Sequence, residues 1–586
     1  MNPSLEVLNK KLLGLEKITK ASEYEIESVI RHTRNSENAD EPCDEWRYEV
    51  IAFSFSENQS GSGNLGTYFG PLWTGTNAAG EVVENPSWRD IDADMLAYLE
   101  ARSRQTTNPL LRARYTGLLW SFTNQVTGNK PNFTFAVENV EMLLRIAAEN
   151  LHEYEVDTIQ KLKRALHLAT SLSNSTLTER VKDTILDYEA RVAQDDKAGL
   201  WGFSFDALIE NKKVALSELL EARVIQELED RLARLDANDA DPFICEHAAE
   251  RLARYYRSKK LTEDAQRMIR LLGHRFETVA KGSTPIHAMA LYEHMYAIYS
   301  DFGLKKEDES LTRLMRSAGP RVRDEMKSVS HQMDISQKEF DEFTEGFIQE
   351  DLSKSLKHIA IYFVPQRDRV IKQVKELEEA APLSSMLTMR LIDHEGRTTS
   401  IVGSADDDLD GRTAQQMAQN MSFSVVFLNG VLSRVIANFE VTAEQLLDYI
   451  FLSPVFKASQ RNFIYAGLSA YLQNSFDITI HLMVPQIEAA FRNMVEIAGG
   501  VILKSARGGG FHLKTLDELL RAGEAGGALG EDVSFYLRLL LTDQRGWNIR
   551  NRVCHGMIPF EQISKGVADR LLHVLLILAL LRVEEA

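Results

Sequence analysis

The sequence predicts a mainly α-helical protein with several domains, and three observations lead to this fold class. A chain of 586 residues is longer than one hydrophobic core usually organises. From about residue 90 to 350 nearly every segment has helical spacing of apolar residues, as in NPLLRARYTGLLWSF and DTIQKLKRALHLATSL. The clearest β-type pattern is one short segment, 387–402. We therefore expect helical domains with one small β-hairpin.

We expect four regions along the chain. Residues 1–150 form a helical N-terminal domain with a loop-rich segment, and residues 151–350 form a solenoid-like α-helical array. Residues 351–480 form an α+β connecting region, and residues 481–586 form a C-terminal helical bundle. The loop-rich segment, 58–81, is dense in Gly, Asn and Ser, which favour turns. Its aromatic residues either pack the loop onto the first domain, which we favour, or line a ligand groove.

Two units of the middle region resemble each other. One begins at Tyr256 and the other at Tyr299, and each has a leucine five residues later (Leu261 and Leu304) with acidic residues close behind. The offset of 43 residues is typical of stacked helical hairpins. An irregular helical bundle is the alternative. Either surface would offer a binding platform for a protein partner.

The segment LTMRLIDHEGRTTSIV, residues 387–402, alternates around Glu395 and Gly396 and predicts a β-hairpin. The following DDDLDG resembles the opening of a calcium-binding loop. The twelfth position of such a loop is a bidentate glutamate, whereas this chain has Met417 there. We favour a solvated acidic turn and expect no metal and no cofactor.

Charge and cysteine usage exclude several classes of protein. The net charge of -18 argues against a broad nucleic-acid-coating surface. Residues 481–586, in contrast, hold twelve Lys or Arg and twelve Asp or Glu, so this region is neutral. Three scattered cysteines indicate a reducing, cytoplasmic compartment. The apolar run 571–583 is too short to span a bilayer, so we expect a buried helix and no membrane association.

Other catalytic motifs are absent from the sequence. It contains no GxxxxGK[ST], GxSxG or HExxH motif. The glycine-rich segments 505–511 and 522–530 lack the lysine and hydroxyl of a phosphate loop, and we expect flexible connections there.

The segment RNRVCHG, residues 550–556, permits two interpretations. In the first, Asn548 caps a short helix that Gly556 ends, and Pro559 blocks its continuation. In the second, Arg550 and His555 act together on a phosphodiester. Arginine stabilises charge on phosphate oxygens, and histidine moves the proton of a ribose 2′-hydroxyl. On an ideal helix Arg550 and His555 lie about 140° apart, whereas Asn551 and His555 are i,i+4 neighbours.

The C-terminal block resembles the family called domain of unknown function 4209, whose hallmark is RNxxxHG. Arg550, Asn551, His555 and Gly556 match that pattern, and the resemblance covers about 481–586. This family is similar to the HEPN superfamily of helical bundles, many members of which are metal-independent ribonucleases. The resemblance implies RNA as substrate, a homodimer formed through the C-terminal domain, and a role in defence against phage or as a toxin.

The resemblance also implies a role for individual residues. Arg550 would grip the scissile phosphate, His555 would act as the base or polarise the 2′-hydroxyl, and Asn551 would orient the histidine or the substrate. Glu488 and Arg492 either brace the site or form only a surface ion pair. Candidate RNA contacts are Arg545 and Arg552. The competing function is a non-catalytic scaffold or sensor whose HEPN-like domain serves dimerisation or ligand binding.

Overall fold

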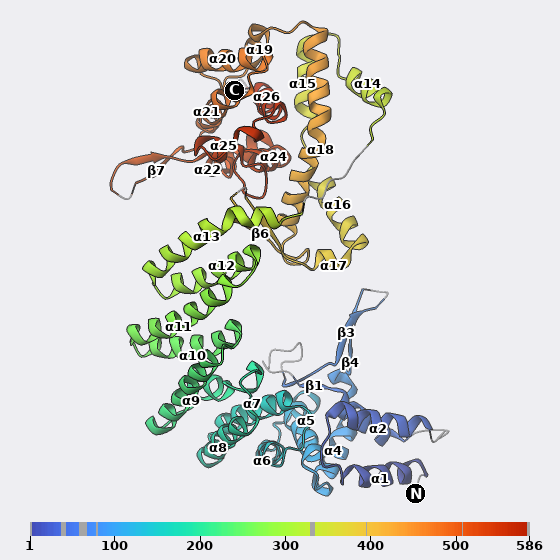
Figure 1. The fold of residues 1–586 in the computed structure, drawn as a ribbon. Helices are drawn as coiled ribbons and strands as arrows, with labels where there is room; N and C mark the ends of the chain where they lie inside the picture. The colour runs from blue at the N-terminus through green and yellow to red at the C-terminus, as the bar shows by residue number, and fades with distance from the viewer. Residues whose placement is uncertain are drawn as a thin grey trace. The chain divides into compact units, whose positions relative to one another are not determined.

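The computed structural model confirms the mainly α-helical fold. It describes residues 3–36, 43–57, 67–77, 80–327, 334–393, 395–506 and 508–582, with 26 α-helices and four small antiparallel sheets of two strands each (Figure 1). Residues 58–66 and 78–79 of the predicted loop-rich segment lie outside the described residues. The chain divides into two compact units, Met1–Thr312 and Arg313–Ala586.

The first unit consists of twelve complete α-helices and two small sheets in its described part. The helices are α1 (Pro3–Leu15), α2 (Glu23–Ser36), α3 (Asp44–Ser54), α4 (Ala93–Gln105), α5 (Pro109–Thr127), α6 (Phe133–Glu149), α7 (Glu155–Ser171), α8 (Ser175–Val192), α9 (Glu218–Ala237), α10 (Pro242–Ser258), α11 (Thr262–Lys281) and α12 (Pro285–Asp301). Strands β1 (Ser56–Glu57) and β2 (Phe69–Gly70) pair, as do β3 (Trp73–Thr76) and β4 (Val82–Asn85). Helix α13 (Lys305–Glu325) crosses into the second unit.

The loop aromatics differ from one another in burial. Phe69 is buried and packs near Phe122 of α5, and the hydroxyl of Tyr68 donates to Glu57, whereas Trp73 is exposed. The prediction that this segment packs onto the first domain is therefore confirmed for Phe69 and Tyr68 and is wrong for Trp73.

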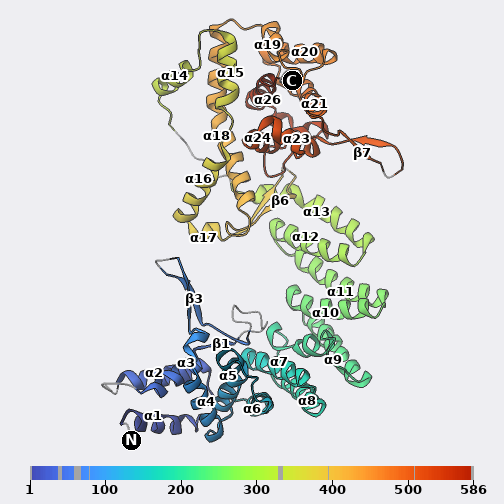
Figure 2. The same cartoon turned by 180° about the vertical axis from the view of Figure 1, so that it is seen from behind.

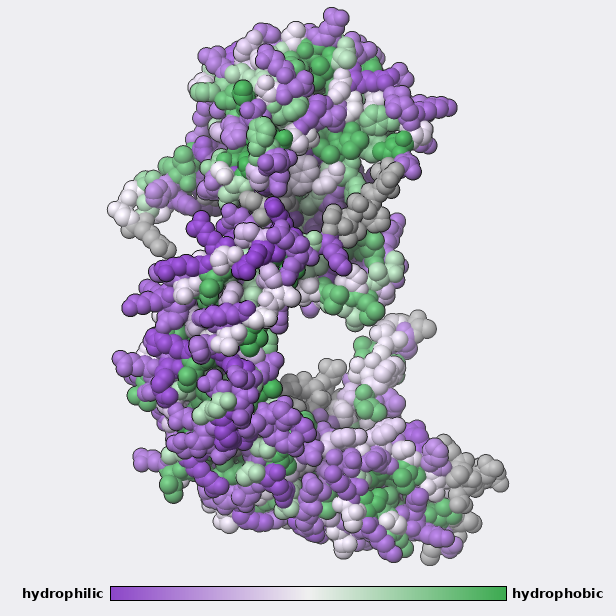
Figure 3. Space-filling model, in the orientation of Figure 1, coloured by the Kyte–Doolittle hydropathy of each residue, from purple (hydrophilic) through white to green (hydrophobic). Residues whose placement is uncertain are grey.

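Helices α9 to α12 stack as the repeat predicts, because each packs against the next along the chain. The repeated Tyr and Leu mark the junctions from α10 to α11 and from α12 to α13. The Leu261 N–H donates to the Tyr256 carbonyl (2.9 Å), and the Leu304 N–H donates to the Tyr299 carbonyl (3.0 Å). In both junctions the residue before the leucine has a left-handed backbone, as is usual after a helix. The face of these helices seen in Figure 3 is largely hydrophilic, as amphipathic helices require.

The second unit contains the remaining complete helices of the described chain. They are α14 (Gln337–Glu345), α15 (Leu352–Tyr362), α16 (Arg367–Ala380), α17 (Pro382–Ser385), α18 (Leu409–Asn438), α19 (Ala443–Ile450), α20 (Arg461–Leu472), α21 (Phe476–Ile497), α22 (Leu516–Leu520), α23 (Gly523–Leu529), α24 (Glu531–Leu541), α25 (Ile549–Cys554) and α26 (Lys565–Ala579). Two hairpins complete it: β5 (Met389–Ile392) with β6 (Thr398–Val402), and β7 (Leu503–Ser505) with β8 (Phe511–Leu513).

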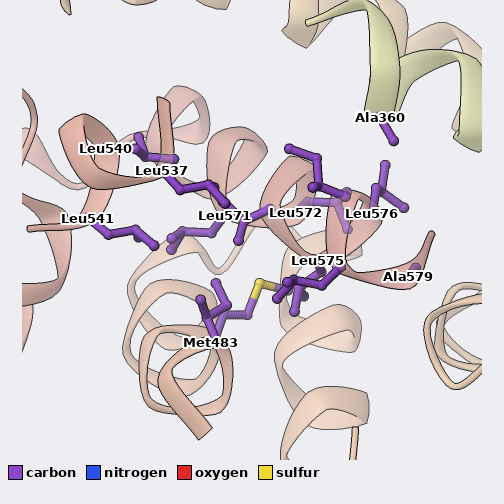
Figure 4. Close-up of a cluster of buried hydrophobic side chains, with 14 of the residues drawn as sticks. Ala360, Met483, Leu537, Leu540, Leu541, Leu571, Leu572, Leu575, Leu576 and Ala579 are labelled. Atoms are coloured by element: carbon purple, nitrogen blue, oxygen red, sulfur yellow. The ribbon is translucent and has the colours of Figure 1, made fainter. Parts of the chain in front are cut away.

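One hydrophobic core joins the whole second unit, and α26 lies at its centre. Every residue from Ala568 to Ala579 is buried, which confirms the buried helix predicted from the apolar run. Around α26 pack α15, α18, α19 and α21. Figure 4 shows leucines of α26 meeting Met483 of α21, Ala360 of α15 and the leucines of α24.

The division of the chain differs from the four regions that the sequence predicted. Helix α21 runs through the boundary expected at 480/481, and the core extends from Phe347 to Ala579. Residues 351–480 and 481–586 therefore fold as one unit. The expected boundary at 150/151 lies inside the first unit, which continues to Thr312, and the one at 350/351 lies inside the second unit, which begins at Arg313. The expected boundary at 480/481 marked the start of the resemblance to the RNxxxHG family. A folding unit is bounded instead by the extent of its hydrophobic core.

The predicted hairpin at 387–402 is confirmed as β5 and β6, with Gly396 in the left-handed region between them (φ 77°). The acidic turn that follows serves the helix after it. The Asp408 carboxylate accepts from the Gly411 N–H (2.8 Å) and caps α18, and the Asp410 carboxylate accepts from Arg367 and Arg545. Asp408 thus caps a helix, and Asp410 pairs with two arginines.

The glycine-rich segments are more ordered than the sequence suggested. Residue 507 lies outside the described residues, and the others of the segment 505–511 belong to the β7–β8 hairpin or to its turn; this hairpin projects from the second unit in both views (Figures 1 and 2). Residues 523–529 form helix α23, because α22 and α24 pack against this segment and override its low helix propensity.

Among the described helices, α18 alone is long and apolar enough to cross a membrane. One face of α18 enters the core through Met417, Leu428, Val431 and Val435, each of which is fully buried. Of the most apolar 18-residue window of α18, 28% is buried inside the structure.

A polar cluster lies inside this core and ties α26 to its neighbours. The His573 ring contacts the Tyr536 hydroxyl of α24 (2.9 Å) and the Ala360 carbonyl of α15 (3.3 Å). The Arg570 guanidinium donates to the Met421 carbonyl of α18 (2.8 Å). The Asp569 carboxylate accepts from Tyr471 of α20 (2.6 Å). Because these groups are buried, their partners fix the rotation of α26 against four helices.

This burial makes the second unit sensitive to acid. Burial, together with the charge of Arg570, lowers the pKa of His573 to about 3. Between pH 6.5 and 3 the unfolded chain binds a proton at this histidine that the folded chain does not bind, so stability falls as the pH falls. From pH 6.5 to 5 we expect this group to remove about 2 kcal/mol from the free energy of unfolding.

Urea unfolding of the wild type and of His573→Gln at both pH values measures this effect. The loss on acidification should be smaller in His573→Gln by that amount. His512→Gln, at an exposed histidine of β8, should keep the full loss. Equal pH dependence of all three proteins would show that His573 does not carry the effect.

Candidate active site

The RNRVCHG segment forms helix α25 and the turn that ends it. Gly556 has a left-handed backbone (φ 66°), its N–H donates to the Val553 carbonyl, and the Met557 N–H donates to the Arg552 carbonyl (2.7 Å). This is the Schellman arrangement of a helix C-terminus. The predicted glycine cap is therefore confirmed, and His555 lies at the C-cap between the helix and Gly556.

The start of α25 differs from the prediction. Asn548 precedes the helix as expected, but its side chain makes no capping bond. Its backbone is left-handed (φ 51°), and its Oδ1 instead accepts from the Asn551 Nδ2 (2.7 Å). Among the described residues, Asn548 is the one non-glycine residue with positive φ at a helix start; the others follow helix ends. The strained backbone of Asn548 thus places its side chain where it fixes that of Asn551.

The loop before Asn548 folds tightly onto α24. The Trp547 N–H donates to the Leu539 carbonyl (2.8 Å). A Cβ atom at Gly546 would lie 2.1 Å from that same carbonyl oxygen, so only glycine permits this approach. The loop is thereby fixed relative to the core helix that precedes it.

Arg550 is held by an ion pair between α25 and α21. Its Nε donates to the Glu488 Oε2 (2.7 Å), and the Arg492 NH2 donates to the Glu488 Oε1 (2.8 Å). The Arg550 and Glu488 side chains are 19% and 14% exposed, so the pair lies at the edge of the solvent. The hydrogen bond that Arg550 donates to Glu488 raises the pKa of Arg550. Glu488, one of the two residues expected to brace the site, thus accepts hydrogen bonds from both Arg550 and Arg492.

Asn551 orients the arginine rather than the histidine. Its Oδ1 accepts from the Arg550 NH1 (3.0 Å), and its Nδ2 donates to Asn548 and to the Thr542 carbonyl (3.3 Å). The expected contact with His555 is therefore replaced by a chain of bonds from Asn548 through Asn551 to Arg550. In the described structure the NH2 of Arg550 has no hydrogen-bond partner.

His555 is exposed to solvent. Its ring makes no hydrogen bond to any described residue, and its backbone N–H donates to the Asn551 carbonyl (3.0 Å). The structure does not bring the His555 ring into contact with Arg550. As helix geometry predicts, the side chains of Arg550 and His555 therefore remain apart within one chain.

The two candidate RNA contacts have protein partners. Arg545 donates through Nε and NH2 to Asp543 and through NH1 to Asp410 (3.0 Å), and these carboxylates raise its pKa. Arg552 donates to the side chain of Gln562, and burial lowers its pKa. Three nitrogens of Arg545 are thus occupied by carboxylates, which suits a structural role for this arginine, whereas Arg552 has no charged partner in hydrogen-bond contact.

Sequence reasoning missed three contributors to the site. They are Asn548 as the partner of Asn551, Gly546 as the residue that permits the loop, and Asp543 as the anchor of Arg545. The signal for the first two was the GWN tripeptide before the helix, since Gly and Asn are the residues that accept close approach and left-handed backbone.

No protein-family model, no curated protein and no solved structure matches this chain. The resemblance to the RNxxxHG family thus rests on the residues that carry it, and the activity that it implies is a proposal.

Replacing Gly546 with alanine should loosen the loop that holds Asn548. The added Cβ clashes with the Leu539 carbonyl oxygen, so we expect a loss of about 1–3 kcal/mol in the free energy of unfolding. Gly527→Ala in α23 is the control, because its Cβ meets nothing within 4 Å and helix propensity favours alanine. Urea unfolding in which both variants match the wild type would contradict the close approach.

Proposed function

We propose that this chain is a metal-independent endoribonuclease that cleaves RNA by attack of the 2′-hydroxyl. The observation that carries the proposal is the arrangement around α25. This short helix holds Arg550 by Glu488 and Asn551 at one end and presents an exposed His555 at the other. The likeness of the surrounding block to HEPN ribonucleases supports the same activity.

Arg550 is suited to bind the scissile phosphate. Two of its nitrogens are fixed by Glu488 and Asn551, which leaves NH2 to donate to a phosphate oxygen. A guanidinium that is already oriented loses less side-chain freedom when the substrate binds. Because the negative charge on the phosphate oxygens increases in the transition state, this donor accelerates the chemical step.

His555 is suited to move the proton. The ring accepts the proton of the 2′-hydroxyl while the 2′-oxygen bonds to phosphorus. The bond from phosphorus to the 5′-oxygen breaks, and that oxygen takes up a proton from a second acid. The products are a 2′,3′-cyclic phosphate and a 5′-hydroxyl. DNA lacks the 2′-hydroxyl and is not a substrate.

A homodimer would complete the site. His555 and Arg550 do not meet within one chain, so one copy does not bring its proton acceptor to the phosphate that its arginine would hold. Two α25 segments facing each other would place the histidine of one copy beside the arginine of the other. The proposed setting is cytoplasmic, with a role as a toxin or in defence against phage.

The second candidate function is a non-catalytic scaffold or sensor. The observation that favours it is the Glu488 carboxylate, which already neutralises Arg550. In that function α25 would serve dimerisation or ligand binding, and the helical array of the first unit would hold a protein partner. An exposed His555 is the feature that favours the nuclease over the scaffold.

The wild type should cleave single-stranded RNA in the presence of EDTA and leave 2′,3′-cyclic phosphate ends. His555→Ala and Arg550→Ala should each reduce the rate by about 10²–10⁴-fold, because each removes a group that acts in the transition state. His512→Ala is the matched control, since His512 is an exposed histidine of the same unit outside α25. Equal rates for wild type and His555→Ala on a range of RNAs would contradict the proposal.

Light scattering should give twice the chain mass of 66.3 kDa at micromolar concentration. Mixing Arg550→Ala with His555→Ala tests whether the site is shared. If each site takes its arginine from one copy and its histidine from the other, mixed dimers contain one intact site. Activity then returns to about a quarter of the wild type. A monomer with full activity, or no recovery on mixing, would contradict the shared site.

A further inference from the structure

The first unit contains a cavity of about 900 Å³ that the proposed ribonuclease does not use. Helix α2, the end of α3, strand β1 and the first turns of α7 supply most of its lining. This volume lies within the range of small-molecule sites. The floor consists of charged side chains: those of Arg114 and Lys161 are 1% and 3% exposed, and those of Glu23 and Glu57 are each 20% exposed. Largely buried charges in a cleft are a frequent mark of a binding site.

Every side-chain nitrogen of the two buried cations of the floor, Arg114 and Lys161, already donates to a protein oxygen. The Lys161 ammonium donates to Glu23 Oε1 (2.6 Å) and to both oxygens of Glu57 (2.9 Å). Arg114 donates to Glu57 and, through its other nitrogens, to the carbonyls of Ala52 and Phe55. Burial alone raises the pKa of Glu23, but Lys161 and His152 lower it well below its usual range. An anionic ligand would therefore find these cations already engaged.

The polar atoms of the cavity lining that lack a full set of partners are hydrogen-bond acceptors. The Oε1 of Gln160 is buried and has no hydrogen-bond partner, which is rare for a buried polar atom. Glu23 accepts only from Lys161 and His152, so each of its oxygens keeps a free lone pair. The Asp157 side chain is 54% exposed and 4.0 Å from the His152 ring. The ligand must therefore donate hydrogen bonds.

Formal charge points to a cation. Four carboxylates line the cavity, whereas the permanent cations are three. The carboxylates belong to Glu23, Glu27, Glu57 and Asp157, and the cations to Arg31, Arg114 and Lys161. With neutral histidines the lining has an excess of one negative charge. A ligand with one positive charge would balance it.

The rim of the cavity is apolar and aromatic. Tyr24 and Tyr154 are 74% and 56% exposed, and Leu72 and Val156 are also exposed. Exposed aromatic faces attract organic cations and cover apolar surface. A ligand with a cationic head and an apolar body would therefore match the polar floor and the apolar rim together.

We propose that this cavity binds a small organic amine, with its ammonium group donating to the Gln160 Oε1 and to the free lone pairs of the carboxylates, and its apolar body against the tyrosines of the rim. This binding site is independent of the ribonuclease, so either proposal can fail alone.

Three probes that share a body but differ in the head group test the proposal. Calorimetry on the full chain compares 2-phenylethylammonium, 2-phenylethanol and 3-phenylpropanoate. We expect the cation to bind with a Kd on the order of 1 mM, as its few non-hydrogen atoms allow, and the alcohol and the anion to bind at least about tenfold more weakly. Equal or tighter binding of the alcohol or the anion, or no binding of the cation up to its solubility limit, would overturn the proposal.

Variants locate the binding. Gln160→Met keeps the length of the side chain but removes the acceptor, and the Kd of the cation should rise about tenfold. Asp157→Asn at the exposed edge should raise it about threefold. Asp187→Asn removes an exposed carboxylate of α8 outside the cavity and should leave the Kd unchanged. Circular dichroism checks that each variant is folded. The same Kd in all three variants would indicate general attraction to an acidic protein and would refute the site.

Discussion

The complete burial of α26 is the constraint on which the second unit depends. Twelve consecutive residues of this helix lie out of solvent, and three of them, Asp569, Arg570 and His573, are ionisable. Burial of such groups is costly unless each is hydrogen-bonded, so the neighbouring helices must supply partners at fixed places. Leucine contacts alone would allow α26 to rotate or slide. The polar groups remove that freedom and fix α15, α18, α20 and α24 around it.

The candidate active site depends on this arrangement. Helix α21 packs on α26 and holds Glu488, while α24 packs into the same core and ends at the loop that holds Asn548. The two partners of Arg550, Glu488 and Asn551, are therefore oriented by two different core helices. A surface helix of six residues has little stability by itself. The side chains of α25 are ordered because α21 and α24, which it packs against, are held in the core.

The two units use buried charge differently. Around α26 the charged groups are enclosed and serve packing. In the first unit the ion pairs of Lys161 and Arg114 lie at the floor of a cavity, where Gln160 has an unmet acceptor. A buried ion pair is weak evidence for stability, because apolar residues of similar volume often stabilise a fold as well. In the first unit this cluster lines the cavity for which we propose an amine ligand.

Local patterns in the sequence determined the helical fold, the hairpin at Gly396, the buried terminal helix, the junctions after Tyr256 and Tyr299, and the Gly556 cap. Each depends on residues within a few positions of one another. The tertiary structure decided the pairing of Arg550 with Glu488, 62 residues apart, the left-handed backbone of Asn548 and the extent of the folding units. These depend on which helices share a core, and residues distant in sequence meet only after that core has formed.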